Sequence, residues 1–103
     1  MTAAQLAFPV DATPDDPHAA ARRHVVEAIA LAAEVHDGIV SPNAVRAYLA
    51  EMPEWDVPPH VVGQTYRALR LAGRLAYAGT EISDDGRGGN AGKIHRTYKW
   101  VTT

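Results

Sequence analysis

The chain has 103 residues, of which 47% are hydrophobic and 21% charged, so it can form one small domain and has no room for a second, catalytic one. It contains no cysteine, which excludes disulfides, thiolate metal sites and a cysteine nucleophile. The longest apolar stretch, residues 25–35, is far shorter than the roughly 20 residues that span a bilayer, and no signal peptide is recognisable. We therefore expect a cytoplasmic protein without a membrane partner.

The net charge of −2 conceals a division along the chain. Residues 1–56 carry three basic and nine acidic side chains, whereas residues 57–103 carry seven basic and three acidic ones. Phosphate binding requires lysine and arginine, so the second half is the half suited to an anionic partner. Chance segregation of surface charge is the alternative interpretation.

Helix signals begin after residues 1–16, which show no sustained periodicity and are predicted to form a flexible arm. Asp16 followed by Pro17 is typical of a helix start, because the carboxylate caps free amides and proline suits the first helical position. Alanine-rich sequence continues as far as His36, and Gly38 is expected to provide a left-handed stop. A very short strand is predicted at residues 39–40.

Ser41 and Pro42 repeat the cap and proline signal and predict a short second helix that ends near Met52 and Pro53. Its inward face is expected to consist of Val45, Tyr48 and Leu49. In the linker that follows, residues 53–58, Trp55 is expected to cover the edge of the core.

A third helix is predicted to follow Pro58 and Pro59 and to run to Ala72, with Gly73 as its stop. Its inward residues are expected to be Val62, Tyr66 and Leu69.

The remaining sequence has the period of strands. Residues 75–82 form one predicted strand, and residues 94–101 alternate as a second, which places Ile94, Tyr98 and Trp100 on one side. Between them, residues 83–92 are rich in glycine and are expected to form a hairpin loop.

The segment from Tyr66 to Leu75, YRALRLAGRL, is similar to the third helix, the small-residue-glycine turn and the first wing strand of winged helix-turn-helix domains. From Pro17 to Val101 the chain resembles that family, which occurs among bacterial regulators and small bacteriophage DNA-binding proteins. The resemblance implies an α+β fold over residues 17–103, with a three-helix helix-turn-helix core and a C-terminal β-hairpin wing. It also implies a non-catalytic protein that binds double-stranded DNA, with the third helix in the major groove and the wing on the backbone or minor groove.

The residues expected to contact DNA follow from this geometry. Glutamine can pair with an adenine edge and arginine with guanine, while Gly63 lets the helix backbone approach the duplex. A solvated polar face, or for His60 a local turn contact, is the alternative. In the wing, Asp84 and Asp85 oppose phosphate binding, so a plain exposed hairpin is the alternative there. The expected DNA-binding residues are His60, Gly63, Gln64, Arg67, Arg70, Arg74, Arg87 and Lys93.

Catalytic and metal chemistry is not expected. The five histidines, at positions 18, 24, 36, 60 and 95, do not occur three or four apart on one helix, as a zinc site would prefer. Ser41 and Ser83 are explained as cap and turn residues. Residues 86–91 formally match a dinucleotide-binding fingerprint, but a strand follows where that fingerprint requires a helix, so no cofactor is expected.

The first predicted helix carries two apolar stripes, of which one core can cover only one. A homodimer or a protein partner is therefore predicted to cover the stripe of Ala28, Leu31 and Val35. The alternative is that the N-terminal arm covers it through Leu6, Phe8 and Val10. A protein-interaction module without DNA binding is likewise the alternative to the DNA-binding function.

Overall fold

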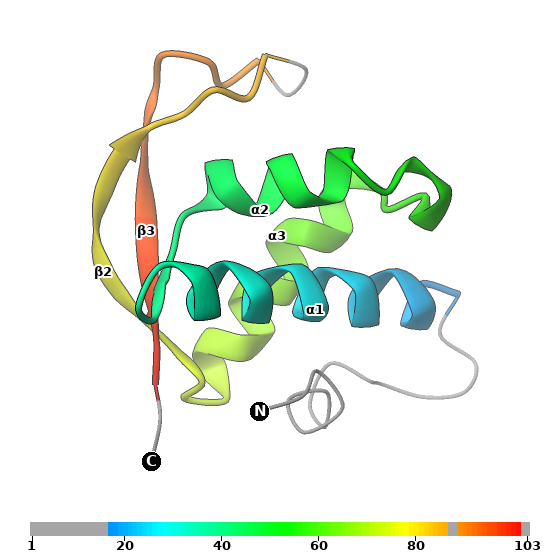
Figure 1. The fold of residues 1–103 in the computed structure, drawn as a ribbon, viewed down its shortest axis with the longest axis horizontal. Helices are drawn as coiled ribbons and strands as arrows, with labels where there is room; N and C mark the ends of the chain where they lie inside the picture. The colour runs from blue at the N-terminus through cyan, green and yellow to red at the C-terminus, as the bar shows by residue number, and fades with distance from the viewer. Residues whose placement is uncertain (1–16, 87–88, 102–103) are drawn as a thin grey trace.

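The computed structural model describes residues 17–86 and 89–101. Within these residues the fold is α+β and consists of three α-helices, one short 3-10 helix and a three-stranded antiparallel sheet. Figure 1 shows α1 and α2 lying side by side, α3 crossing behind them, and the sheet along one side of the helices. In chain order the elements are α1 (Ala19–Val35), β1 (Ile39–Val40), α2 (Pro42–Ala50), η2 (Pro53–Trp55), α3 (Pro59–Leu71), β2 (Leu75–Ile82) and β3 (Ile94–Trp100).

The helix α1 begins later than its sequence indicates. Pro17 and His18 form a turn, and His18 occupies the N-cap without a side-chain hydrogen bond. The predicted cap residue Asp16 and the predicted N-terminal arm lie outside the described residues. At the other end Gly38 has a φ of 89° and its N–H donates to the Ala33 carbonyl at 2.7 Å, so the predicted stop is confirmed. Asp37 is also left-handed, with a φ of 54°.

The ends of α2 and α3 follow their sequence signals closely. The Ser41 hydroxyl accepts a hydrogen bond from the Ala44 N–H at 3.3 Å, as an N-cap residue does. After α3, Gly73 has a φ of 75°, and the N–H of Arg74 donates to the Leu69 carbonyl at 2.8 Å. This 6→1 bond satisfies a carbonyl that the helix end would otherwise leave unpaired.

The core lies where the three helices meet the sheet. On α3, the predicted inward residues Tyr66 and Leu69 are buried, and Val62 is half-buried and packs against the core. Val61 and Thr65, which were not expected in the core, are fully buried. The Thr65 hydroxyl donates to the Val61 carbonyl at 2.7 Å, so this buried polar group is paired. On α1, Ala28 belongs to the core, and only Leu31 and Val35 of its stripe are exposed. The largest fully buried side chains are Val25, Val26, Ile29, Val40, Val45, Val61, Thr65 and Leu69.

The sheet has the strand order β1-β3-β2, with β3 antiparallel to both neighbours. In β2, Tyr77 pairs with Tyr98 and Gly79 pairs with Thr97, so Ala78 is an extra residue at a bulge. Tyr98 and Trp100 pack against the core as predicted, but Ile94 is 74% exposed. Its strand partner Ile82 is 66% exposed as well, so the two isoleucines pair with each other on a part of the hairpin where the helices do not bury them.

The connection between α2 and α3 contains a 3-10 turn that the sequence did not predict. Its Trp55 is half-buried at the core edge, as expected, and its ring stacks on His24 of α1 with 4.2 Å between centroids and 8° between planes. No helix in the described part of the chain combines the length and apolar character needed to cross a membrane.

Candidate nucleic-acid interface

The outward side of α3 brings four of the predicted DNA-binding residues together. His60, Gly63, Gln64 and Arg67 are all exposed, and their spacing of three and four residues places them on one face of the helix. The helix contains no acidic residue. This face, which we call the α3 polar face, therefore presents hydrogen-bonding and cationic groups without a competing carboxylate of its own.

Two side chains at the start of α1, Arg22 and the N-cap residue His18, border the α3 polar face. Arg22 donates from Nη2 to Oε1 of Gln64 at 3.3 Å, and the rings of His18 and His60 meet edge to face with 5.0 Å between centroids. The amide oxygen has two lone pairs and the amide nitrogen two hydrogens, so Gln64 retains the capacity to pair with a base edge while it contacts Arg22. The histidine contact joins two elements, so it differs from the local turn contact that was the alternative for His60.

Beside α3, the predicted residue Arg70 belongs to a cluster whose hairpin members, Tyr77 and Arg96, were not singled out from the sequence. Tyr77 of β2 is 48% exposed, and the guanidinium carbons of Arg70 and Arg96 lie 5.2 and 4.2 Å from its ring centroid. We call these three residues the arginine-tyrosine cluster. Tyr77 also contacts Tyr98, whose ring stacks on Tyr66 of α3 at 4.9 Å. The cluster thus carries two positive charges at the junction of α3 and the hairpin, and the contact between rings fixes its position.

The acidic side chains of the hairpin are held by partners within the fold. Asp84 pairs with Arg46 of α2 at 3.1 Å, and Arg46 also donates to the amide oxygen of Asn43. Asn43 in turn donates to the Ile82 carbonyl at 2.9 Å and accepts from the Asp84 N–H at 3.1 Å. Asp85 accepts from the Asn90 amide at 3.4 Å. These bonds anchor the hairpin to α2, and the Arg46 charge offsets that of Asp84, which weakens the objection that this carboxylate would repel phosphates.

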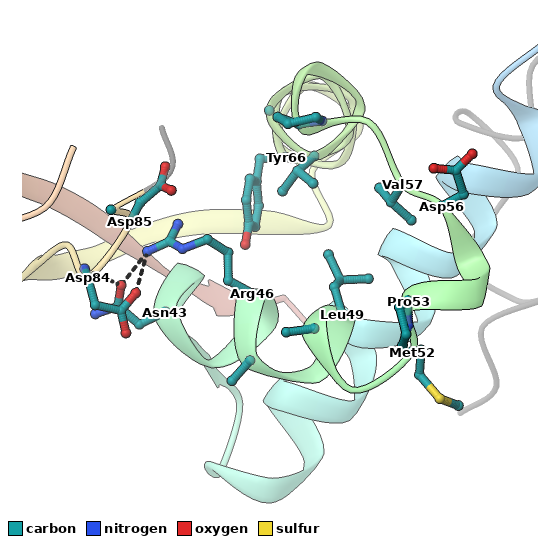
Figure 2. A pocket seen from close by; sticks show the side chains of 16 residues that line it. Asn43, Arg46, Leu49, Met52, Pro53, Asp56, Val57, Tyr66, Asp84 and Asp85 are labelled. Atoms are coloured by element: carbon teal, nitrogen blue, oxygen red, sulfur yellow. Dashed lines mark hydrogen bonds and ion pairs between the residues drawn. The ribbon is translucent and has the colours of Figure 1, made fainter. Parts of the chain in front are cut away.

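An open groove of about 930 Å³ separates α2 from α3 and ends at the first residues of the hairpin loop. Figure 2 shows Tyr66 pointing from α3 toward α2, and Arg46 reaching from α2 to Asp84. Burial raises the pKa of Tyr66 well above its ordinary value, so its hydroxyl stays protonated. That hydroxyl is buried and has no hydrogen-bond partner among the described residues. Tyr66 therefore lines the groove as a neutral aromatic side chain whose ring stacks on Tyr98.

Ser41, Glu81 and His95 meet although they lie far apart in the sequence. Ser41 Oγ donates to the Glu81 carboxylate, 2.7 Å from Oε1 and 2.8 Å from Oε2, and His95 Nε2 lies 2.6 Å from Oε1. The carboxylate is placed between the hydroxyl and the imidazole, so His95 has no contact with Ser41 through which to act as its base. The arrangement joins the N-terminus of α2 to the hairpin rather than forming a nucleophile.

The other predicted residues are dispersed. Lys93 is exposed beside the hairpin loop, whereas Arg74 is half-buried at the opposite end of the hairpin, where its carbonyl accepts from the Val101 N–H at 2.9 Å. The structure therefore does not bring Arg74 and Lys93 together. Arg87 lies outside the described residues.

No protein-family model matches the chain, and comparisons with curated proteins and with solved structures find no significant similarity. The function must therefore be inferred from the chemistry of the α3 polar face and of the hairpin.

Proposed function

We propose that the chain is a winged-helix protein that binds double-stranded DNA and catalyses no reaction, as a regulator or a bacteriophage-type DNA-binding protein does. In this proposal α3 enters the major groove, and the β2–β3 hairpin is the wing that contacts the backbone or the minor groove. The order of elements supports the fold assignment, since three helices, a short strand after α1 and a C-terminal hairpin occur in the expected sequence.

The observation that carries the proposal is the α3 polar face. Gln64 and Arg67 are residue types that form bidentate contacts with adenine and guanine, and both are exposed on the same side of one helix. Gly63 directly precedes Gln64 on this side of the helix, and a Cβ added there would meet nothing within 4 Å, so the fold does not require a glycine at this position. A close approach of the α3 backbone to a duplex would explain why a glycine stands at this position.

The arginine-tyrosine cluster and Lys93 supply the charge that a wing needs. Arg96 and Lys93 lie on the hairpin, and Arg70 connects the hairpin to α3, so positive side chains continue from the helix onto the strands. Contacts of this kind to phosphates give affinity without sequence preference.

The decisive experiment first selects preferred duplexes from a random pool and then compares one with a scrambled duplex at several salt concentrations. We expect Gln64→Ala or Arg67→Ala to cost about 1–3 kcal/mol on the preferred duplex and much less on the scrambled one, because only the correct base edge loses its partner. Lys93→Ala and Arg96→Ala should weaken binding to both duplexes alike and lower the salt slope by about one unit each, because fewer counterions are released.

Lys99→Ala is the matched control, since it removes the same charge from β3. Lys99 is exposed and neighbours Tyr98 in the strand, so it projects from the opposite face of the sheet. Its replacement should change neither affinity nor salt slope appreciably. If the protein binds no duplex even at low salt, a protein-interaction module becomes the correct interpretation. If Lys99→Ala weakens binding as much as Arg96→Ala does, the hairpin has no defined DNA-facing side.

A further inference from the structure

A second groove lies between α1 and the end of α2. Its volume is about 390 Å³, and its lining residues come from α1, from the last turn of α2 and from the segment up to Trp55. Leu31, Tyr48, Met52 and Trp55 provide its apolar surface. Leu31 is 44% and Met52 39% exposed, so a large part of this surface faces water. Exposed apolar groups gathered in a groove are typical of a surface that binds a partner.

Carboxylates surround this apolar surface. Glu27 and Glu34 of α1 and Glu51 after α2 all line the groove and are all exposed. Among the described residues, those that line the groove include no lysine or arginine. Glu27 lies 3.9 Å from His24 Nδ1, whereas Glu34 and Glu51 stand farther along the groove. We call this site the acidic groove.

The acidic groove faces away from the candidate DNA interface. Arg22, on one flank of α1, contacts Gln64 of α3, whereas Glu27 and Leu31 line the groove on the flank next to α2. Within the described part of the chain, none of its lining residues belongs to α3 or to the hairpin. A partner seated there would leave the α3 polar face accessible.

The negative charge of the acidic groove disfavours two possible occupants, the chain's own residues 1–16 and a second copy of the chain. Residues 1–16 of the chain contain three aspartates and no lysine or arginine, so this segment would add negative charge to an acidic site. A symmetric dimer through the groove would place Glu27, Glu34 and Glu51 of one copy against the same residues of the other. Both arrangements bring like charges together, which disfavours them by electrostatic repulsion.

We propose that the acidic groove binds an amphipathic helix of a partner protein, with apolar anchors against Leu31, Tyr48, Met52 and Trp55 and with lysine or arginine beside the three glutamates. Methionine and aromatic side chains suit this mode, because they adapt to or stack on inserted side chains. The proposal is independent of DNA binding and concerns a different face of the molecule.

A fluorescent leucine-lysine peptide of about 18 residues, with leucines at helical spacing, is a direct probe of the full chain by anisotropy. We expect saturable binding with one peptide per chain, and much weaker binding of the peptide in which glutamate replaces each lysine. Glu34→Gln with Glu51→Gln should weaken binding about tenfold, since two solvent-screened ion pairs with the peptide are lost. Leu31→Gln should weaken it to a similar extent.

Asp37→Asn with Asp56→Asn is the matched charge control. Both aspartates are exposed outside the acidic groove, and both have a positive φ that asparagine also tolerates. For Leu31→Gln the control is Ile94→Gln, at an exposed position of the hairpin. Neither control should change peptide affinity.

Three results would overturn the proposal. Equal loss in the groove variants and their controls would show only general attraction to a negative protein. Peptide binding that occurs only after residues 1–14 are deleted would identify the chain's own segment as the occupant. Self-association abolished by Leu31→Gln, without peptide binding, would identify a second copy.

Discussion

The Glu81 carboxylate connects three positions that are distant in the sequence. It accepts hydrogen bonds from the Ser41 hydroxyl and the Asn43 N–H of α2, and it contacts His95 on the neighbouring strand. Partial burial by itself would raise the pKa of Glu81, but the bonds from Ser41, His95 and Asn43 outweigh it and hold the pKa below its ordinary value. The ionised form is therefore favoured by folding.

Glu81→Gln should reduce the free energy of unfolding by about 1–3 kcal/mol at pH 7, because the charged acceptor is lost. A carboxyl group whose pKa is lower in the folded state contributes stability above its unfolded pKa, and that stability is lost as the pH falls through the folded pKa. The difference between wild type and variant should consequently shrink in acid. Urea unfolding from pH 7 down to pH values below the ordinary glutamate pKa measures it.

Glu34→Gln provides the control for Glu81→Gln, since Glu34 is exposed on α1. It should change stability by no more than about 0.5 kcal/mol at any pH. If Glu81→Gln lowers the free energy of unfolding by the same amount at every pH, the variant loses shape complementarity rather than charge. That result would contradict the stabilising role of the ionised Glu81 carboxylate.

Tyr66 presents the opposite situation, because its hydroxyl is buried and has no partner among the described residues. A buried polar group without a hydrogen bond costs free energy on folding. Tyr66→Phe removes the hydroxyl and retains the ring that stacks on Tyr98. It should leave stability unchanged or raise it by up to about 1 kcal/mol, as measured by urea unfolding. A loss above about 1 kcal/mol would show that the hydroxyl has a hydrogen-bond partner.

At the scale of elements, local signals predicted most of the fold. The Ser41 cap, the Gly38 and Gly73 stops and the β2 bounds were all identified from the sequence, because each depends on residues within a few positions of one another. The exposed face of α3 was also predicted, since a polar helix face depends only on the helical period.

Contacts between elements were harder to predict. Thr65 was not expected in the core, because the packing of α3 against its neighbours decides which side of the helix is buried; its hydroxyl is then paired within α3 by the Val61 carbonyl. The contact of Arg96 with Tyr77 depends on the register between β2 and β3. The bulge at Ala78 changes which β2 side chains share a face with Arg96, and the alternating pattern of the sequence does not reveal a bulge. The pairing of Asp84 with Arg46 likewise spans 38 positions of the sequence and required the hairpin to lie against α2.

Gly63→Ala and Gly73→Ala should have opposite effects on the stability of the fold, although both positions have room for a Cβ. At both Gly63 and Gly73 an added Cβ meets nothing within 4 Å, but only Gly73 has a positive φ. Gly63→Ala should stabilise the fold by about 0.5–1 kcal/mol, because alanine is the better helix residue, whereas Gly73→Ala should cost about 1–2 kcal/mol. If the α3 backbone approaches DNA at Gly63, Gly63→Ala should also weaken duplex binding despite its greater stability.

Circular dichroism during urea unfolding, together with duplex titration, tests both glycine predictions. Gly63→Ala that stabilises the fold and binds DNA normally would place the duplex away from this turn of α3. Destabilisation by Gly63→Ala would instead indicate that the fold itself requires the glycine.

At the scale of the whole molecule, charge is arranged by face. The acidic groove lies on the side of α1 next to α2, while the α3 polar face and the arginine-tyrosine cluster carry cationic groups. A net charge of −2 is therefore compatible with the proposed DNA binding and its steep salt dependence, because the local field at a binding surface, and not the total charge, decides such an interaction.

The same arrangement predicts that the free protein is monomeric at low ionic strength. Of the α1 stripe expected to form a dimer, Ala28 is buried, and Leu31 and Val35 alone expose too little area for a stable symmetric interface. The glutamates beside Leu31 would also repel their copies, and this repulsion is screened within about 10 Å at 0.1 M salt. Sedimentation velocity at low and at high salt should give a monomer in the first condition, with any weak association confined to the second and removed by Leu31→Gln. A dimer that is stable at low salt and is lost with Leu31→Gln would show that apolar contact outweighs the charge, and would make the dimer the correct account of this face.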